Sequence, residues 1–177
     1  QYARFWAGLP ATGVSTIVPG IVTLTGSDPH LNIFTLSGSD LGNIRLDIQV
    51  PAGSTVLVNL TGEHARMYSL GYGDFTIDPH LILYNFYEAS ILDLNRIGVQ
   101  GSILAPYAHI NFESGHVEGT LIGLSLLSLN AEEHDFPFRG DLPAVPEAAS
   151  PLLLASGIFA LGFFRRNRTD LSPPTRR

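Results

Sequence analysis

Cysteine and lysine are both missing from the 177-residue chain. A chain without cysteine can form no disulfide bond, no thiolate metal site and no cysteine nucleophile. The lack of lysine also excludes internal lysine–asparagine isopeptide cross-links. Runs of helix-favouring residues are scarce, whereas 18 glycines and 12 prolines are spread among many strand-forming residues. This composition predicts short β-strands joined by tight turns.

Positive charge is also scarce over most of the chain. Residues 1–147 carry five arginines against 15 aspartates and glutamates, a net charge of −10. Residues 148–177 carry five arginines against one aspartate, a net charge of +4. Binding to phosphate groups requires a basic face, so the acidic body argues against a nucleic-acid partner.

The C-terminal residues divide into a linker, an apolar stretch and a tail. Residues 141–150 form a Pro/Ala-rich linker, and residues 151–168 contain an apolar run that ends in Arg165, Arg166 and Arg168. A helix formed by the uncharged residues from Ala148 onward would span roughly 25 Å, slightly less than a hydrocarbon core of about 30 Å. We predict one transmembrane helix over 151–168, followed by a disordered tail over 169–177. The arginines predict a cytoplasmic C-terminus and an acidic body outside.

Alternating apolar residues predict strands at residues 32–36, 43–50 and 55–60. The second and third could form a hairpin or two successive strands of a solenoid. Residues 99–105 and 117–123 repeat one pattern at an offset of 18 residues, a length that suits one coil of a β-helix. We therefore predict an all-β domain over residues 1–140, a right-handed β-helix or similar solenoid, with a β-sandwich as the alternative.

The motifs of the body resemble the choice-of-anchor A domain, also described as a collagen-binding-type adhesin domain. They run from the Pro-Ala-Gly segment at 50–62, through 83–89, 101–108 and 115–122, to Glu133-His134 and Pro137-Phe138, and the resemblance covers roughly Asp28 to Gly140. Tyr107 departs from the usual asparagine. The resemblance implies an exported protein with a surface or matrix role and no reaction.

The linker and apolar run resemble a PEP-CTERM sorting signal. Val145-Pro146-Glu147 precedes the apolar helix, and Arg165, Arg166 and Arg168 follow it, although Ala148 stands where the motif has proline. The resemblance implies an exosortase-type processing enzyme as partner and delivery to the envelope or matrix. Because the chain begins at Gln1 with no signal peptide before the domain, we expect the domain to be truncated at its N-terminus.

Candidate chemistry is sparse. Glu133, His134 and Asp135, next to Glu132, could hold a metal or Ca²⁺ ion, but we favour a solvated turn. His109 and His116 could form a zinc pair with Glu113 or Glu118, but we favour separate histidines. Residues 85–88 could form a ligand edge, but we favour Phe86 in the core and Asn85 bonded to backbone. We expect no cofactor and no catalytic residues.

The resulting hypothesis is a non-enzymatic, exported bacterial surface or extracellular-matrix protein. It would adhere to an extracellular polymer or matrix protein, such as collagen or exopolysaccharide, and lie at the cell envelope, single-pass in the membrane before processing. One alternative is an ice-binding-like solenoid, which would need a longer ladder than Ser102 and Thr120 offer. Another is a polysaccharide-cleaving β-helix enzyme, for which convergent carboxylates or arginines are required.

Overall fold

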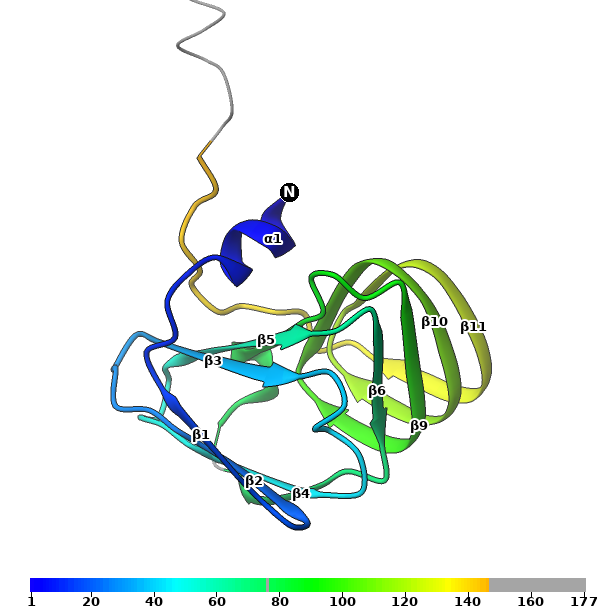
Figure 1. Cartoon of the computed structure of the whole chain (residues 1–177), viewed down its shortest axis with the longest axis horizontal. Helices are drawn as coiled ribbons and strands as arrows, with labels where there is room; N and C mark the ends of the chain where they lie inside the picture. Colours follow the sequence, from blue (N-terminus) through cyan, green and yellow to red (C-terminus); the bar gives the residue numbers. More distant parts are fainter. Residues whose placement is uncertain (76, 147–177) are drawn as a thin grey trace, which may run out of the picture. The chain divides into compact units, whose positions relative to one another are not determined.

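The computed structural model describes residues 1–75 and 77–146. Short strands dominate the described chain, as the glycine- and proline-punctuated sequence predicts (Figure 1). The elements in chain order are α1 (Tyr2–Ala7), β1 (Val14–Val18), β2 (Ile21–Thr25), β3 (Leu31–Ser37), β4 (Arg45–Gln49), β5 (Thr55–Thr61), β6 (His64–Tyr68), β7 (Gly71–Phe75), the 3-10 helix η1 (Pro79–Leu81), β8 (Ile82–Asn85), β9 (Ile91–Gln100), β10 (Ser102–Glu118) and β11 (Leu121–His134).

The strands pair in parallel across successive turns of the chain. One sheet has the order β1-β2-β4-β7 and the other the order β3-β5-β8-β10-β9-β6, with β11 added beside β10. Only β1 and β2 pair antiparallel among the described strand pairs. Figure 1 shows β6, β9, β10 and β11 curling side by side. This parallel stacking differs from the antiparallel pairing of a β-sandwich, and the right-handed sense of the predicted coil stays a prediction.

β4 and β5 lie in different sheets, so they are successive strands of the coil and not a hairpin. The three strands predicted between residues 32 and 60 are confirmed as β3, β4 and β5, with ends that differ by one or two residues. The prolines and glycines between them mark the corners, where the chain leaves one sheet and enters the next.

The 18-residue repeat is confirmed as a stacking repeat. Val117 pairs with Val99, and Ile103 pairs with Leu121, each 18 residues away along the chain. A Cβ atom added to Gly119 would lie 2.4 Å from the carbonyl oxygen of Gly101, so the two glycines allow neighbouring backbones to approach closely at this corner. The repeated aliphatic residues therefore stack on each other in neighbouring strands, and the repeated glycines form the bend between these strands.

The core has an inner and an outer part. The main cluster lies inside the coil and contains inward-facing residues of nearly every strand, with Phe34, Tyr84 and Phe86 among the largest fully buried side chains. The prediction that Phe86 packs in the core is confirmed. A second cluster, built on Ile33, Leu57 and Leu83, lies on the other side of the β3-β5-β8 strands.

Both ends of the compact unit cover this second cluster. Trp6 of α1 packs on it, and so do Phe138 and Leu142 from the segment after β11. The indole Nε1 of Trp6 donates a hydrogen bond to the carbonyl oxygen of Pro143 at 3.0 Å. No sequence pattern predicted α1, because a six-residue helix forms only where tertiary contacts stabilise it.

The compact unit extends from Gln1 to Pro143. The first residues of the predicted linker belong to it, since the backbone N–H of Asp141 donates to the Thr55 hydroxyl at 2.9 Å. The predicted transmembrane helix over 151–168 and the tail over 169–177 lie outside the described residues. Within the described residues, no helix is both long enough and apolar enough to cross a bilayer.

Candidate functional site

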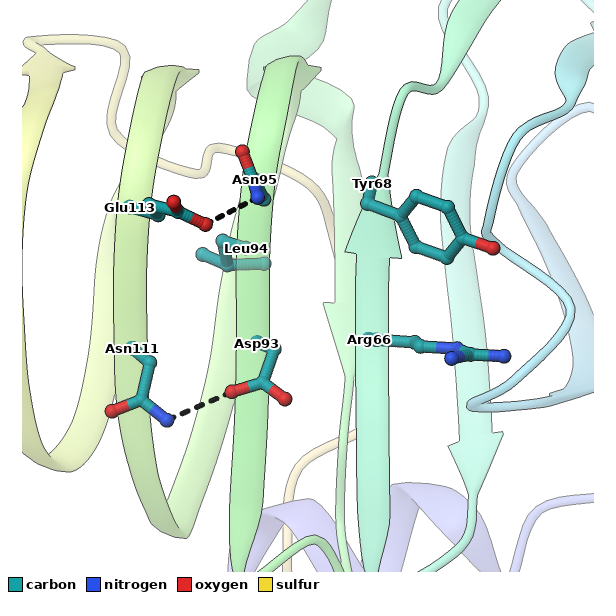
Figure 2. Close-up of a pocket in the computed structure, with 7 residues that line it drawn as sticks. All are labelled: Arg66, Tyr68, Asp93, Leu94, Asn95, Asn111 and Glu113. Carbon is teal, nitrogen blue, oxygen red and sulfur yellow. Dashed lines mark hydrogen bonds between the residues drawn. The ribbon is translucent and has the colours of Figure 1, made fainter.

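The outward face of β6, β9 and β10 carries a polar pocket, shown in Figure 2. The pocket has a volume of about 260 Å³. Alternation along each strand explains its composition, because every second residue points into the core and the others point outward. The lining residues are Arg66, Tyr68, Asp93, Leu94, Asn95, Asn111 and Glu113.

One row of the pocket is centred on Asp93. Its carboxylate accepts a hydrogen bond from the Asn111 amide at 2.8 Å and lies 2.7 Å from Nε2 of His64. Partial burial raises the pKa of Asp93, but the hydrogen bonds from Asn111 and His64 outweigh it, so the pKa lies below its ordinary value. The carboxylate is therefore ionised at neutral pH and available as an acceptor.

A second row joins Asn95 and Glu113. The Asn95 amide donates to the Glu113 carboxylate, and its carbonyl oxygen accepts from the Ser114 hydroxyl at 3.0 Å. Arg96 interrupts the strand pairing here: its φ of 49° lies in the left-handed region, and the next register pairs join Asn95 to Ser114 and Ile97 to Gly115. This local bulge fixes the amide and carboxylate beside each other.

The third part of the pocket is Arg66 beside Tyr68. The guanidinium carbon of Arg66 lies 5.2 Å from the centroid of the Tyr68 ring, a distance typical of a cation–π contact. The Tyr68 ring in turn packs on Gly42, where a Cβ atom would lie 2.1 Å from the ring. The aromatic ring is therefore held in place, while the exposed Arg66 side chain faces solvent.

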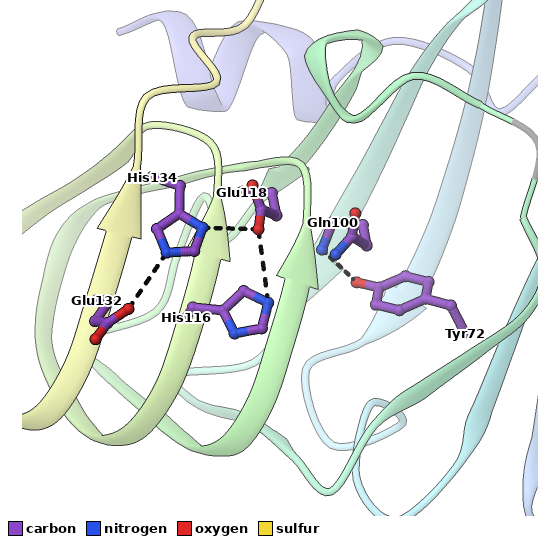
Figure 3. Close-up of polar contacts among 6 residues, drawn as sticks. All are labelled: Tyr72, Gln100, His116, Glu118, Glu132 and His134. Carbon is purple, nitrogen blue, oxygen red and sulfur yellow. Dashed lines mark hydrogen bonds and ion pairs between the residues drawn. The ribbon is translucent and has the colours of Figure 1, made fainter.

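A second polar cluster occupies the neighbouring face and is shown in Figure 3. Glu118 lies 2.7 Å from Nδ1 of His134 and 3.7 Å from Nε2 of His116, and Glu132 lies 3.4 Å from Nε2 of His134. The two imidazole rings stack with centroids 5.3 Å apart. The hydrogen bonds to Glu118 and Glu132 raise the pKa of His134 above its ordinary value.

The structure separates the residues proposed as metal ligands. His134 turns toward Glu118 and Glu132, whereas Glu133 accepts the backbone N–H of Leu121 at 3.0 Å. The described residues contain no group of three or more His, Cys, Asp or Glu side chains placed to hold a metal ion.

The alternative zinc pair also has its histidines apart. His109 bonds the Ser125 hydroxyl at 2.7 Å on the pocket face, while His116 lies in the cluster with Glu118. The two histidines therefore belong to different faces of the coil.

The Ser102–Thr120 ladder considered for ice contact is not an exposed pair. Ser102 is buried, and its hydroxyl accepts the backbone N–H of Thr120 at 2.9 Å. Asn85 is buried as well, and its amide donates to the carbonyl oxygen of Ala3 in α1 at 2.8 Å. The prediction that Asn85 bonds backbone is confirmed, although its partner is the helix and not a local turn.

The residues of the predicted sorting signal lie at the end of the described chain or beyond it. Val145 and Pro146 belong to no helix or strand. Glu147, Arg165, Arg166 and Arg168 lie outside the described residues.

Sequence signals found these side chains only in part. Glu118, Glu132 and His134 were considered as metal ligands, but His64, Arg66, Tyr68, Asn95 and Asn111 were not considered as a site. They come from three turns of the coil, and residues 18 to 29 positions apart meet here, as the Asn111–Asp93 and His64–Asp93 contacts illustrate. To predict this pocket from the sequence, one would have to know which turns of the coil stack on each other and in which register.

Comparison with known proteins identifies a matching family model. No curated protein and no solved structure matches the chain. A family model described as "Putative Ice-binding-like adhesive domain" matches residues 1–135. That span covers both polar faces, both sheets and most of the compact unit, and well over half of the 177 residues. The chain belongs to this ice-binding-like adhesive domain family.

Proposed function

We propose that this chain is an exported adhesive module that binds a neutral, hydroxyl-rich extracellular polymer through the polar pocket of β6, β9 and β10. The observation that carries the proposal is the arrangement in that pocket of two amides, two carboxylates and an arginine beside a fixed tyrosine ring. Such side chains donate and accept hydrogen bonds from sugar hydroxyls, and the ring supplies an apolar platform. Membership of an adhesive family supports the same general function.

Charge favours a neutral polymer over an anionic one. Asp93 and Glu113 bring two negative charges to the pocket, against one positive charge on Arg66. Residues 1–147 also carry a net charge of −10. A polyanion would therefore meet repulsion both at the site and over the whole body.

The ice-binding alternative is less well supported by the exposed faces. Binding to an ice surface calls for a flat, regular face of small hydroxyl side chains, whereas the pocket face mixes arginine, tyrosine, amides and carboxylates. The hydroxyl of Ser102 is buried. A thermal-hysteresis measurement tests this alternative, and we expect no hysteresis from the purified chain.

A polysaccharide-cleaving enzyme is the other alternative. In the pocket, the Asp93 and Glu113 carboxylates are each held by an asparagine amide. That arrangement suits binding, and we expect no release of new reducing ends when the chain is incubated with neutral or acidic polysaccharides.

Surface delivery is the second part of the proposal. The body resembles a choice-of-anchor A domain and the tail a PEP-CTERM signal, so we propose processing by an exosortase-type enzyme and a final place at the bacterial envelope or in the matrix. Mass spectrometry of the mature C-terminus in the native host tests this part. Cleavage near Val145-Pro146-Glu147 is expected, and a mature chain that still carries Arg165, Arg166 and Arg168 would contradict it.

A binding experiment tests the adhesive site. The full chain in mild detergent is passed over immobilised dextran (neutral), alginate (anionic) and collagen, and we expect retention on dextran. Arg66→Gln and Asn111→Ala should each weaken retention about tenfold, the effect of losing one or two hydrogen bonds.

Arg4→Gln is the matched control. The guanidinium carbon of Arg4 lies 4.5 Å from the centroid of the Tyr107 ring, so the same kind of contact is removed away from the pocket. Retention on alginate or collagen alone, or equal losses in all three variants, would contradict the proposed site.

A further inference from the structure

β11 is the last strand of the parallel stack. It pairs with β10 along its length, and the described residues provide no strand on its other side. Its outer edge therefore carries backbone N–H and C=O groups without strand partners, the arrangement onto which another strand can be added.

The same strand exposes a row of large apolar side chains. Leu124, Leu127 and Leu129 are 61%, 61% and 67% exposed, with Ile122 and Leu126 beside them at 48% and 52%. No charged residue and no proline occurs between Gly119 and Ala131. Natural edge strands are usually protected by lysine, proline or inward charges, and this edge has none of them over those residues.

At the opposite end of the stack, the chain folds back on itself and adds β1 as an antiparallel edge strand. β1 folds back antiparallel on β2, and the backbone N–H groups of Thr12 and Gly13 both donate to the carbonyl oxygen of Ile33 at 3.0 Å. Within the described residues, up to residue 146, the segment that follows β11 does not provide an equivalent edge strand. It runs past η1 and β5, where Arg139 N–H donates to the carbonyl oxygen of His80 in η1 at 2.7 Å and Asp141 N–H donates to the hydroxyl of Thr55 in β5.

We propose that the β11 edge is the contact between two copies of this chain, paired antiparallel about a two-fold axis near Leu127. A two-fold contact uses the same patch on both copies, and the uncharged stretch from Gly119 to Ala131 supplies a patch that can face itself. In the dimer, the β11 strands of the two copies pair antiparallel, so that the two stacks form one continuous sheet.

Charge selects the antiparallel direction. Glu132 and Glu133 lie at one end of β11, while its other end, at Leu121 and Ile122, is uncharged. Antiparallel pairing places the two glutamates of each copy opposite the uncharged end of the other. Parallel pairing would put each glutamate opposite its own counterpart, which is destabilising.

Single-cysteine cross-linking tests the pairing, because the chain has no cysteine of its own. The full chain in mild detergent carries Leu127→Cys and is oxidised over a range of concentrations. We expect a disulfide-linked dimer that forms at concentrations at which Val14→Cys, 66% exposed on the edge strand at the other end, remains monomeric.

A mixed pair tests the direction. Leu124 and Asn130 lie three residues on either side of Leu127, so Leu124→Cys mixed with Asn130→Cys should give the linked dimer, and each variant alone should give several-fold less. Cross-linking of each variant with itself but not in the mixture would overturn the antiparallel arrangement.

Two further outcomes would overturn the proposal as a whole. Leu127→Cys that stays monomeric but reacts freely with a maleimide would show an edge that no copy covers. Leu127→Cys that stays monomeric and is protected from the maleimide would show that the chain's own C-terminal residues cover the edge. Leu127→Lys with Leu129→Lys should abolish the dimer in sedimentation without changing the circular dichroism, since both side chains are exposed.

Discussion

At the scale of single residues, close backbone approach is the most sensitive feature of the stack. Gly119 lies directly over Gly101, and a Cβ atom at Gly119 would meet the Gly101 carbonyl oxygen at 2.4 Å and its carbonyl carbon at 2.5 Å. The obstructing atoms belong to the backbone of the neighbouring strand, so no side-chain movement can relieve the contact.

Gly119→Ala should therefore destabilise the fold by about 1–3 kcal/mol, the usual cost of forcing extra atoms into a packed site. The free energy of unfolding from urea denaturation measures the loss. Gly71→Ala is the matched control, since nothing lies within 4 Å of its added Cβ and the change should be nearly neutral. Equal stability of both variants would contradict this account of the corner.

The pair of His134 and Glu118 makes a second residue-scale prediction, on pH dependence. Hydrogen bonds to Glu118 and Glu132 raise the folded-state pKa of His134, and His116 is the other titratable group facing Glu118. A histidine with a raised pKa contributes its stabilisation fully below its unfolded pKa of about 6.5 and loses it as pH rises through the folded value.

The C-terminal part of β11 should therefore exchange its amide hydrogens faster, relative to the rest of the sheet, as pH rises above that range. NMR titration of the His134 ring gives the pKa directly. Glu118→Gln should move this pKa back toward its ordinary value, and His109, which bonds a serine, serves as the internal control. An unchanged His134 pKa in the variant would contradict the role of Glu118.

At the scale of elements, two buried asparagines hold α1 on the sheet. The Asn59 amide donates to the Trp6 carbonyl oxygen at 3.0 Å, and the Asn85 amide donates to the Ala3 carbonyl oxygen at 2.8 Å and to the Asn59 side chain at 2.7 Å. Two carbonyl groups of the six-residue helix thus accept hydrogen bonds from side chains of β5 and β8.

Asn85→Ala removes the donor to both partners and should cost about 1–3 kcal/mol, since buried acceptors are left unsatisfied. The loss is measured by urea denaturation. Detachment of α1 is measured separately as faster tryptic cleavage after Arg4 in the folded protein. Asn111→Ala, an asparagine on the exposed pocket face, is the control and should change neither. Slow cleavage at Arg4 in both variants would contradict the anchoring role.

At the scale of the whole molecule, a partly buried and a fully buried tyrosine join the two sheets. The hydroxyl of Tyr72 on β7 lies 3.2 Å from that of Tyr84 on β8 and accepts the backbone N–H of Gln100 on β9 at 3.0 Å. The Tyr72 hydroxyl thus links β7, the last strand of the β1-β2-β4-β7 sheet, to β9 of the other sheet. Burial raises the pKa of Tyr72 to about 12 and that of Tyr84 well above its ordinary value.

The fold should lose stability in alkaline solution as pH rises from about 10 to about 12. In that window the unfolded tyrosines ionise while the folded ones stay protonated, so the unfolded state binds fewer protons and stability falls. Denaturation curves at several pH values measure the decline, and the part of the tyrosinate absorbance that comes from Tyr72 and Tyr84 should rise together with unfolding. Tyr72→Phe should flatten the decline. Ionisation of Tyr72 and Tyr84 near pH 10 without unfolding would contradict the prediction.

Local patterns in the sequence predicted much of the fold. Strands 32–36, 43–50 and 55–60, the core position of Phe86 and the 18-residue repeat all depend on alternation or on glycine spacing, which a strand carries within itself. The candidate site was harder to predict. The considered cluster of Glu133, His134 and Asp135 is contiguous in sequence, yet alternation sends its members in different directions and joins His134 to Glu118, 16 residues earlier.

Composition and residue spacing alone establish that this chain is acidic, free of cysteine and lysine, rich in short strands and repetitive at 18 residues over its second half. Which outward residues meet depends on how the turns of the folded chain stack. Leu31 pairs with Thr55, 24 residues later, whereas His109 pairs with Ser125, 16 residues later. The residues needed to complete a turn depend on the geometry of each corner, which is set by packing of the whole core. That geometry brings Asp93 into one pocket with Arg66 and Tyr68, and no local sequence pattern predicts it.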